Sequence, residues 1–254
     1  MEYKVHNVEW NDKKVGQLWD FYNNYPAFED LWFSKAVGRG IIKFASKFKT
    51  ISGDVLDYGM GKGHFATYLL ENKMVNVYGC DFSEETVLNN EQRFKNESYF
   101  KGCVLIKEFP SSFKENQFDY VFLIEAIEHL TDNYLHPTLI EIHRVLKPGG
   151  VVIITTPNNE DLNKQNVICP DCGCVFHRVQ HVRSFTAASL KRLVNKHGFI
   201  DLFCDATDFF QFTNKGNVYK VRNIFKKRFF ANYQYPHLAY IGRKTKNEEL
   251  AQSQ

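Results

Sequence analysis

Short apolar runs alternate with longer amphipathic stretches through the central part of the chain. The runs are continuous, as in buried strands, whereas apolar residues in the stretches recur every three or four positions, as in helices. The predicted strands are 55–58, 75–80, 103–106, 120–124 and 151–155, and the predicted helices are 64–71, 83–94, 134–146 and 187–197. This alternation predicts an α/β fold with a parallel sheet that helices cover on both faces.

Residues 1–50 precede this alternation and are rich in aromatic side chains. Apolar residues at helical spacing predict one amphipathic helix around 15–22 and another around 41–48. Two interpretations stay open for this helical segment: packing against the sheet, or a lid that closes over the site and excludes water. The rings that would form a lid are Trp10, Trp19, Tyr22, Tyr25, Trp32 and Phe33.

Residues 51–243 are expected to form the main domain, with a CPxCG loop at 165–183 and a basic, aromatic insertion at 212–232. The insertion fits a solvated surface segment, or a patch for an anionic substrate such as a phosphate, a nucleotide-linked sugar or RNA. Residues 244–254 are expected to be a frayed tail.

Composition narrows the class of protein. A formal net charge of +3 over 254 residues is too small to argue for nucleic acid by itself. No long apolar run predicts a transmembrane helix, and the first residues do not resemble a signal peptide. The six cysteines do not form the framework of a secreted disulfide protein, which favours a cytoplasmic location.

Residues 53–64, with the sequence GDVLDYGMGKGH, predict a strand, a glycine turn and a helix N-terminus. Asp57 ends the strand, and Gly59, Gly61 and Gly63 follow at every second position. Glycine tolerates positive φ and has no Cβ, so a ligand can approach the backbone closely. The free N–H groups of the new helix would face that ligand, and Asp57 can accept a hydrogen bond from an ammonium group or a backbone N–H.

Asp81 ends the next predicted strand, 18 positions after Gly63. In nucleotide-binding α/β folds, an acidic residue near this spacing binds ribose hydroxyls. The glycines read GxGxG without the last fingerprint glycine, so the dinucleotide-binding pattern fits poorly.

The chain resembles instead the class I S-adenosylmethionine-dependent methyltransferases. Asp57 with the three glycines matches their first motif, Asp81 matches the second, and FDYV at 118–121 and RVLKPGG at 144–150 match later stretches. The resemblance implies a doubly wound, mostly parallel seven-stranded Rossmann-like sheet, with an antiparallel edge formed by 201–206 and 237–242. It also implies that S-adenosylmethionine is bound by Asp57, Gly59, Gly61, Gly63, Asp81, Phe82 and Glu125.

Residues 123–130, LIEAIEHL, supply candidate catalytic groups. On a helix, Glu125, Glu128 and His129 would share one face, either as simple helix caps or as catalytic groups. Methyl transfer to a hydroxyl needs the reactants held in line and a proton removed. We expect His129 to be the general base, because its ordinary pKa of about 6.5 suits proton abstraction near neutral pH.

The same stretch resembles two subfamilies: O-methyltransferases of the ubiquinone-biosynthesis type, and small-RNA 3′-end 2′-O-methyltransferases. The second group binds a divalent metal through two glutamates and two histidines. That resemblance implies a manganese, magnesium or iron site formed by Glu125, Glu128, His129 and His181.

The CPDCGC stretch at 169–174 predicts a zinc knuckle as an alternative metal site. A structural zinc needs four ligands, and Cys169, Cys172, Cys174 and His177 could supply them locally. No second CxxC is present. Two other interpretations therefore stay open: a loop whose cysteines are reduced and lie over the substrate pocket, or a loop that carries His177 and His181 to the active site.

Together these features predict an O-methyltransferase that acts on a small or glycan-linked hydroxyl or on a phosphate-bearing group. The aromatic N-terminus and the CPxCG loop resemble methyltransferases of bacterial surface-polysaccharide (capsule) biosynthesis. Two alternatives remain: a metal-dependent RNA 2′-O-methyltransferase, and a non-catalytic S-adenosylmethionine-binding module that regulates a partner.

Overall fold

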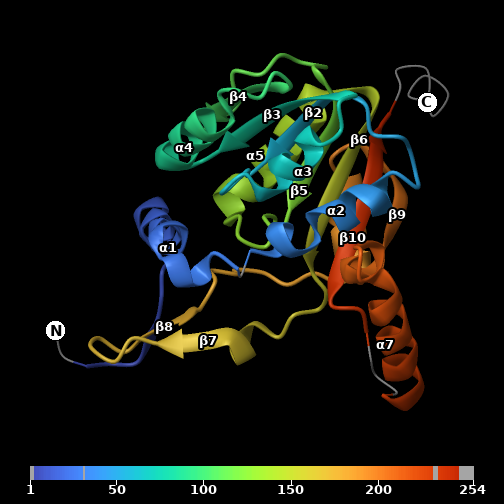
Figure 1. The fold of residues 1–254 in the computed structure, drawn as a ribbon. Coiled ribbons are helices and arrows are strands. Elements are labelled where there is room, and N and C mark those ends of the chain that lie inside the picture. The colour runs from blue at the N-terminus through green and yellow to red at the C-terminus, as the bar shows by residue number, and fades with distance from the viewer. Residues whose placement is uncertain (1–2, 31, 231–233, 246–254) are drawn as a thin grey trace.

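The computed structural model describes residues 3–30, 32–230 and 234–245, and its centre is one twisted seven-stranded sheet (Figure 1). The spatial order is β4-β3-β2-β5-β6-β10-β9. The strands are β2 Gly53–Tyr58, β3 Val75–Asp81, β4 Phe100–Leu105, β5 Phe118–Ile124, β6 Leu146–Pro157, β9 Phe199–Thr207 and β10 His237–Lys244. The first five are parallel, and β10 runs antiparallel to both β6 and β9. This confirms the predicted fold, including its antiparallel edge.

Helices cover both faces of the sheet. They are α2 Phe33–Ala45, α3 His64–Leu70 and α4 Glu84–Phe94 on one face, and α5 Asp132–Val145 and α6 Ala187–Asn195 on the other. Alternate strand residues feed two separate cores, as the two-residue period of a strand requires. In β5, for example, Phe122 packs with α3 while Val121 packs with α5.

The carboxyl ends of the parallel strands meet at one edge of the sheet, which is where ligands bind in this architecture. His237, the first residue of β10, pairs there with Pro157 and Thr207, the last residues of β6 and β9. The segments that follow β6 and β9, and the segment that precedes β10, therefore meet the sheet at the same edge as the glycine turn.

Residues 165–183 form more than the predicted loop. β7 Asn166–Ile168 and β8 Cys174–His177 form a hairpin, and β1 His6–Asn7 adds a third strand to it. The cysteine stretch makes the hairpin turn, where the Cys169 N–H donates to the Cys174 carbonyl oxygen at 2.8 Å. Short helical turns lie at η1 Pro26–Phe28 and η2 Leu162–Gln165.

The N-terminal segment contains two helices of different character. α1 Asp12–Asn24 has no buried residue, and it stands apart from the sheet in Figure 1. In contrast, α2 buries six residues, among them Val37 and Ile41, in the core. Of the two interpretations for residues 1–50, packing thus describes α2, and the lid stays a prediction for α1.

The basic insertion predicted at 212–232 contains α7 Gly216–Phe229, which follows the short turn η3 Phe209–Phe212. Residues 231–232 of the insertion lie outside the described residues. The predicted tail at 244–254 starts too early, because Lys244 closes β10. Its buried ammonium group donates to Asn116 Oδ1 and to the Leu146 carbonyl oxygen, each at 2.9 Å. The rest of that tail, 246–254, lies outside the described residues. Within the described part of the chain, no helix has the length and apolar character needed to cross a bilayer.

Candidate functional site

A cavity of about 560 Å³ lies at the carboxyl edge of the sheet. Its floor comes from the ends of β2, β3 and β5, and its cover comes from α1 and the aromatic ring of Trp32. It runs from the glycine turn at Gly59 and Gly61 to the polar group around His129. One continuous cavity therefore joins the two regions that the sequence singled out.

The three glycines of the turn have different roles. All have left-handed backbones, with φ of +74°, +51° and +71° for Gly59, Gly61 and Gly63. A Cβ built at Gly61 would meet nothing closer than 4.0 Å, so the backbone faces open space. A Cβ at Gly63 would lie 2.3 Å from Asn90 Oδ1 in α4, and Gly63 does not line the cavity. Gly63 thus allows helix packing, whereas Gly59 and Gly61 leave room for a ligand.

Asp81 lies in the cavity wall and is held by the backbone. Its Oδ2 accepts the Gly61 N–H at 2.9 Å, and its Oδ1 accepts the Ser83 N–H at 3.0 Å. Burial raises the pKa of Asp81, and these N–H donors oppose that rise. Phe82, next in the chain, also lines the cavity. This arrangement fits a ribose, since carboxylate oxygens have further lone pairs for hydroxyl donors.

Asp57 lies one layer beneath the cavity and does not line it. It is 2% exposed, and burial raises its pKa well above the usual range, with a further rise from nearby Asp81 and opposition from the Ala66 N–H. Its Oδ2 has no hydrogen-bond partner among the described residues. Asp57 therefore lies behind the glycine turn and is not part of the cavity lining.

The strand predicted to end at Ile124 is confirmed, but the helical spacing considered for Glu125, Glu128 and His129 is wrong. After β5 the chain makes turns, and Glu125 has a left-handed backbone with φ of +46°. The carboxylate of Glu125 lines the cavity, but its Oε2 lies 3.3 Å from Nδ1 of His237. Glu125 is therefore not grouped with Glu128 and His129. Sequence reasoning missed His237, whose signal is its position at the start of β10.

Glu128, His129 and His181 do come together, with one potential ligand atom from each lying within 4.8 Å of the others. Glu128 is 1% exposed, and neither of its oxygens has a hydrogen-bond partner in the described part of the chain. Burial raises the pKa of Glu128, and the Glu125 carboxylate raises it further. Buried polar groups of this kind are normally satisfied, which makes Glu128 a candidate to contact a bound ligand.

His129 is neutral in this environment. Burial lowers its pKa to about 3, with a further contribution from His181, whose ring centroid lies 4.8 Å away. Nδ1 of His129 lies 3.3 Å from the carbonyl oxygen of Gln180. The premise of an ordinary pKa for a general base therefore does not hold here, whereas a neutral imidazole is the form that binds metals.

A second trio extends the first through His181. Nδ1 of His181 contacts Glu160, and Nε2 of His181 lies 3.9 Å from Glu128 Oε1. His177 stacks on His181 at 4.6 Å between ring centroids, and its Nε2 lies 3.5 Å from Glu160 Oε1. Sequence reasoning missed Glu160, which follows β6 in a segment without a motif.

The proposed zinc quartet is not assembled. His177 belongs to the Glu160 trio, and no trio that includes Cys169, Cys172 or Cys174 is found among the described residues. All three thiols are partly exposed in and beside the hairpin turn. The N–H groups of Cys172 and Asp171 lower the pKa of the Cys169 thiol, as in a knuckle, but local ligands do not complete a tetrahedron.

Helix α1 lines the cavity through Asp12, Val15, Gly16, Trp19, Asp20 and Asn23. Trp19 Nε1 donates to Gln180 Oε1 at 2.9 Å, and the Trp19 ring meets the edge of His129 at 4.9 Å. The hydroxyl of Tyr22 donates to the Arg178 carbonyl oxygen at 2.6 Å. Because α1 has no buried residue, these contacts hold it at the site.

Comparisons with known proteins agree with this geometry. Residues 33–202 match the methyltransferase-domain family. A probable S-adenosylmethionine-dependent methyltransferase of Mycolicibacterium smegmatis is 28% identical over 173 residues, which are 68% of this chain and 61% of that protein. The chain thus spans about three fifths of that relative. A demethylmenaquinone methyltransferase of Staphylococcus saprophyticus is 26% identical over 215 residues, covering 77% of this chain and 88% of that one.

The same fold occurs in a solved structure of 1,6-didemethyltoxoflavin-N1-methyltransferase from Burkholderia thailandensis, with bound 1,6-didemethyltoxoflavin and S-adenosylhomocysteine. It shares 18% identity with a TM-score of 0.64 and covers 95% of each chain. The family match, the strand order and the glycine turn beside Asp81 agree. The chain therefore belongs to the class I S-adenosylmethionine-dependent methyltransferases.

Proposed function

We propose that this chain transfers a methyl group from S-adenosylmethionine to an oxygen of a small or glycan-linked acceptor. The observation that carries the proposal is the single cavity that joins Gly59, Gly61 and Asp81 to Glu125 and His129. A donor in one half and an acceptor in the other would meet within this continuous cavity, as an in-line transfer requires.

The sulfonium of S-adenosylmethionine supplies the activated methyl group when it is bound. The chain's own groups position it: the open backbone at Gly61 accommodates the donor, and Asp81 accepts ribose hydroxyls. Trp19 and Trp32 line the cavity, and their rings would exclude water from it. Fixed dipoles stabilise the dispersed sulfonium charge of the transition state more strongly where water is excluded. Glu125, with Oε1 unpaired among the described residues, lines the cavity between the donor half and the acceptor half.

The acceptor half favours a metal-dependent form of the reaction. Glu128, His129 and His181 fit a divalent ion, because two imidazoles and a carboxylate suit iron or manganese and leave positions open. Such an ion would bind the acceptor oxygen and lower its pKa. Glu125 is not a ligand in this set, and no other described residue takes its place as a fourth ligand. Glu160 would orient His181 through Nδ1, the ring nitrogen that does not face Glu128.

The acceptor itself is proposed as a sugar hydroxyl, supported by the aromatic faces of Trp19, Trp32 and Tyr134 along the cavity. RNA is the second candidate, supported by the metal trio and by the excess of lysine and arginine in 212–232. A non-catalytic module is disfavoured by the buried Glu128 carboxylate, whose oxygens have no hydrogen-bond partner among the described residues.

The test titrates the chain with S-adenosylhomocysteine and then measures methyl transfer from labelled S-adenosylmethionine to glycans, RNA and quinols. Methylation of a hydroxyl supports the proposal, and methylation of RNA selects the second candidate. Tight S-adenosylhomocysteine binding without transfer to any of these, with and without added manganese or iron, would overturn it in favour of a binding module.

A further inference from the structure

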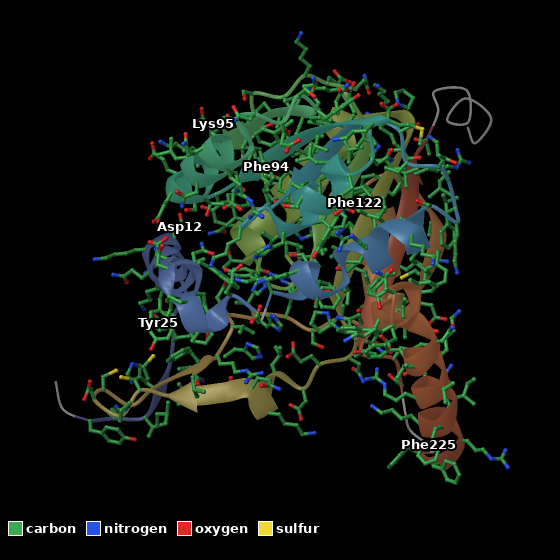
Figure 2. All side chains as sticks on the ribbon, viewed as in Figure 1. Asp12, Tyr25, Phe94, Lys95, Phe122 and Phe225 are labelled. Atoms are coloured by element: carbon green, nitrogen blue, oxygen red, sulfur yellow. The ribbon has the colours of Figure 1, made fainter. Side chains whose placement is uncertain are left out.

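Helix α7 places its apolar side chains outward. Val218, Val221, Ile224, Phe225 and Phe229 are between 56% and 70% exposed. Residues 218, 221, 225 and 229 recur at steps of three and four, so they form one stripe along the helix. Figure 1 shows α7 projecting from the sheet, and Figure 2 shows Phe225 near its far end.

The inner face of α7 is polar and firmly attached. Asn223, which is 2% exposed, donates to Oδ2 of the fully buried Asp208 at 2.7 Å. Arg222 donates to the same oxygen at 2.9 Å, and Tyr219 stacks on Phe210 at 4.9 Å between ring centroids. The orientation of the helix is therefore fixed, and the usual arrangement of a surface helix, apolar inward and polar outward, is reversed.

The charge around the stripe has a single sign. Lys220, Lys227 and Arg228 each lie three or four positions from Ile224, which places them on the same side of the helix. No aspartate or glutamate occurs from residue 209 to residue 247. An exposed apolar stripe beside lysine and arginine is the pattern of a helix that lies in a membrane interface.

We propose that α7 docks this protein onto the surface of an anionic lipid bilayer, with the stripe inserted among the headgroups and the basic residues facing lipid phosphates. Charge complementarity selects this occupant. RNA would match the cations, but its phosphates gain nothing from exposed Val218, Val221 and Ile224. A bilayer matches both the apolar stripe and the charge.

The position of α7 connects this surface with the active-site edge. α7 lies between β9 and β10, whose residues Thr207 and His237 pair at the carboxyl edge of the sheet. His237 in turn lies 3.3 Å from Glu125 in the cavity. Docking through α7 would therefore hold the cavity near a lipid surface, where a lipid-borne acceptor could reach it.

The experiment measures co-sedimentation of the full chain with vesicles of phosphatidylcholine alone, and of phosphatidylcholine with an equal amount of phosphatidylglycerol. Binding to the anionic vesicles, weakened by salt, is the expected result. The charge variant Lys220→Gln/Arg228→Gln and the stripe variant Val221→Ser/Phe225→Ser should each lower binding on the order of tenfold.

Matched controls separate docking from general surface effects. Leu88→Ser removes a side chain on α4 that is 63% exposed, and Lys95→Gln/Lys101→Gln removes two exposed charges far along the chain from α7. Both controls should bind like the wild type. Thermal unfolding of all variants checks that the fold is retained, which is expected because no stripe residue is buried.

Three outcomes would overturn the proposal. The first is no binding to anionic vesicles, and the second is binding that both α7 variants retain. The third is salt-sensitive RNA binding, or self-association seen by light scattering, that depends on the same α7 residues while vesicles are not bound.

Discussion

The two halves of the cavity hold their carboxylates in opposite ways. Asp81, in the cofactor half, accepts backbone N–H groups on both oxygens, at 2.9 and 3.0 Å. Glu128, in the acceptor half, is more deeply buried than the partly exposed Asp81, yet neither of its oxygens finds a hydrogen-bond partner among the described residues. The buried hydroxyl of Thr156 adjoins Glu128 but lies outside hydrogen-bond geometry.

The two halves therefore differ in how far the chain itself satisfies the carboxylates. In the cofactor half, both oxygens of Asp81 are held by backbone N–H groups, although Oδ2 of Asp57 behind the turn has no partner among the described residues. In the acceptor half, both oxygens of Glu128 lack a partner among the described residues, whereas the rings of His129 and His181 contact Gln180 and Glu160. An unsatisfied buried polar group costs about 1–3 kcal/mol. Such a cost persists where a bound ligand offsets it, so we interpret the acceptor half as a site completed by a metal ion.

The largest effect is expected in the cofactor half. Asp81→Ala removes the acceptor of two backbone N–H groups and of the ribose, so S-adenosylhomocysteine affinity should fall on the order of 100-fold. Calorimetric titration measures this. The exposed Glu108→Ala variant is the control and should bind normally. An Asp81→Ala affinity within a few-fold of wild type would contradict the assigned ribose contact.

A pH effect of intermediate size is expected from His129 in chelator-treated protein. An unfolded imidazole takes up a proton below about pH 6.5, while buried His129 stays neutral down to a pKa of about 3. Falling pH therefore favours the unfolded chain, by about 2 kcal/mol at about pH 5. His129→Asn should lose that part of the pH dependence in urea unfolding, whereas exposed His6→Asn should keep it. Equal pH dependence in all three proteins would contradict the buried neutral state.

A smaller effect is expected from Glu160, which contacts the ring nitrogen of His181 that faces away from Glu128. Glu160→Gln should weaken manganese binding about tenfold, since the partner of a metal-bound histidine orients it. S-adenosylhomocysteine affinity should stay unchanged, because the two halves of the cavity bind their ligands independently. The matched control is Glu108→Gln. A loss of S-adenosylhomocysteine binding in Glu160→Gln would show that the halves are not independent.

The smallest effect on affinity is expected from Trp19→Ala. This change removes the bond to Gln180 and the ring contact with His129, so α1 should open more often and proteolysis within α1 should quicken several-fold. S-adenosylhomocysteine affinity should change by less than about threefold, because Asp81 and the turn remain. Phe21→Ala, on the exposed side of the same helix, is the control. Unchanged proteolysis would contradict a cover held by Trp19.

The sequence predicted the cofactor half because its signals are local. Strand, glycine turn and helix follow one another from 53 to 70, and Asp81 ends the next strand. The acceptor half depends on long-range placement. Glu160, His181 and His237 reach the site from different segments, and the left-handed backbone of Glu125 breaks the helical spacing that grouped it with Glu128. Burial, which lowers the His129 pKa, is likewise a property of the folded chain.

The hairpin and α7 show the same limit. A CPxCG stretch predicts a knuckle turn, and the structure has such a turn, but the strand that joins it comes from residues 6–7. Similarly, the composition of 212–232 shows basic and apolar residues without saying which face is buried. The contacts of Asn223 and Arg222 with Asp208, and of Tyr219 with Phe210, fix the helix so that its apolar residues face outward.

The most direct test of the central claim titrates chelator-treated wild type and Glu128→Gln with S-adenosylhomocysteine, and then with manganese or iron(II). Without metal, S-adenosylhomocysteine is expected to bind both proteins equally. One metal ion per chain is expected to bind the wild type, and none is expected to bind Glu128→Gln. Cofactor binding that requires the metal, or a metal affinity unchanged by Glu128→Gln, would contradict the central claim.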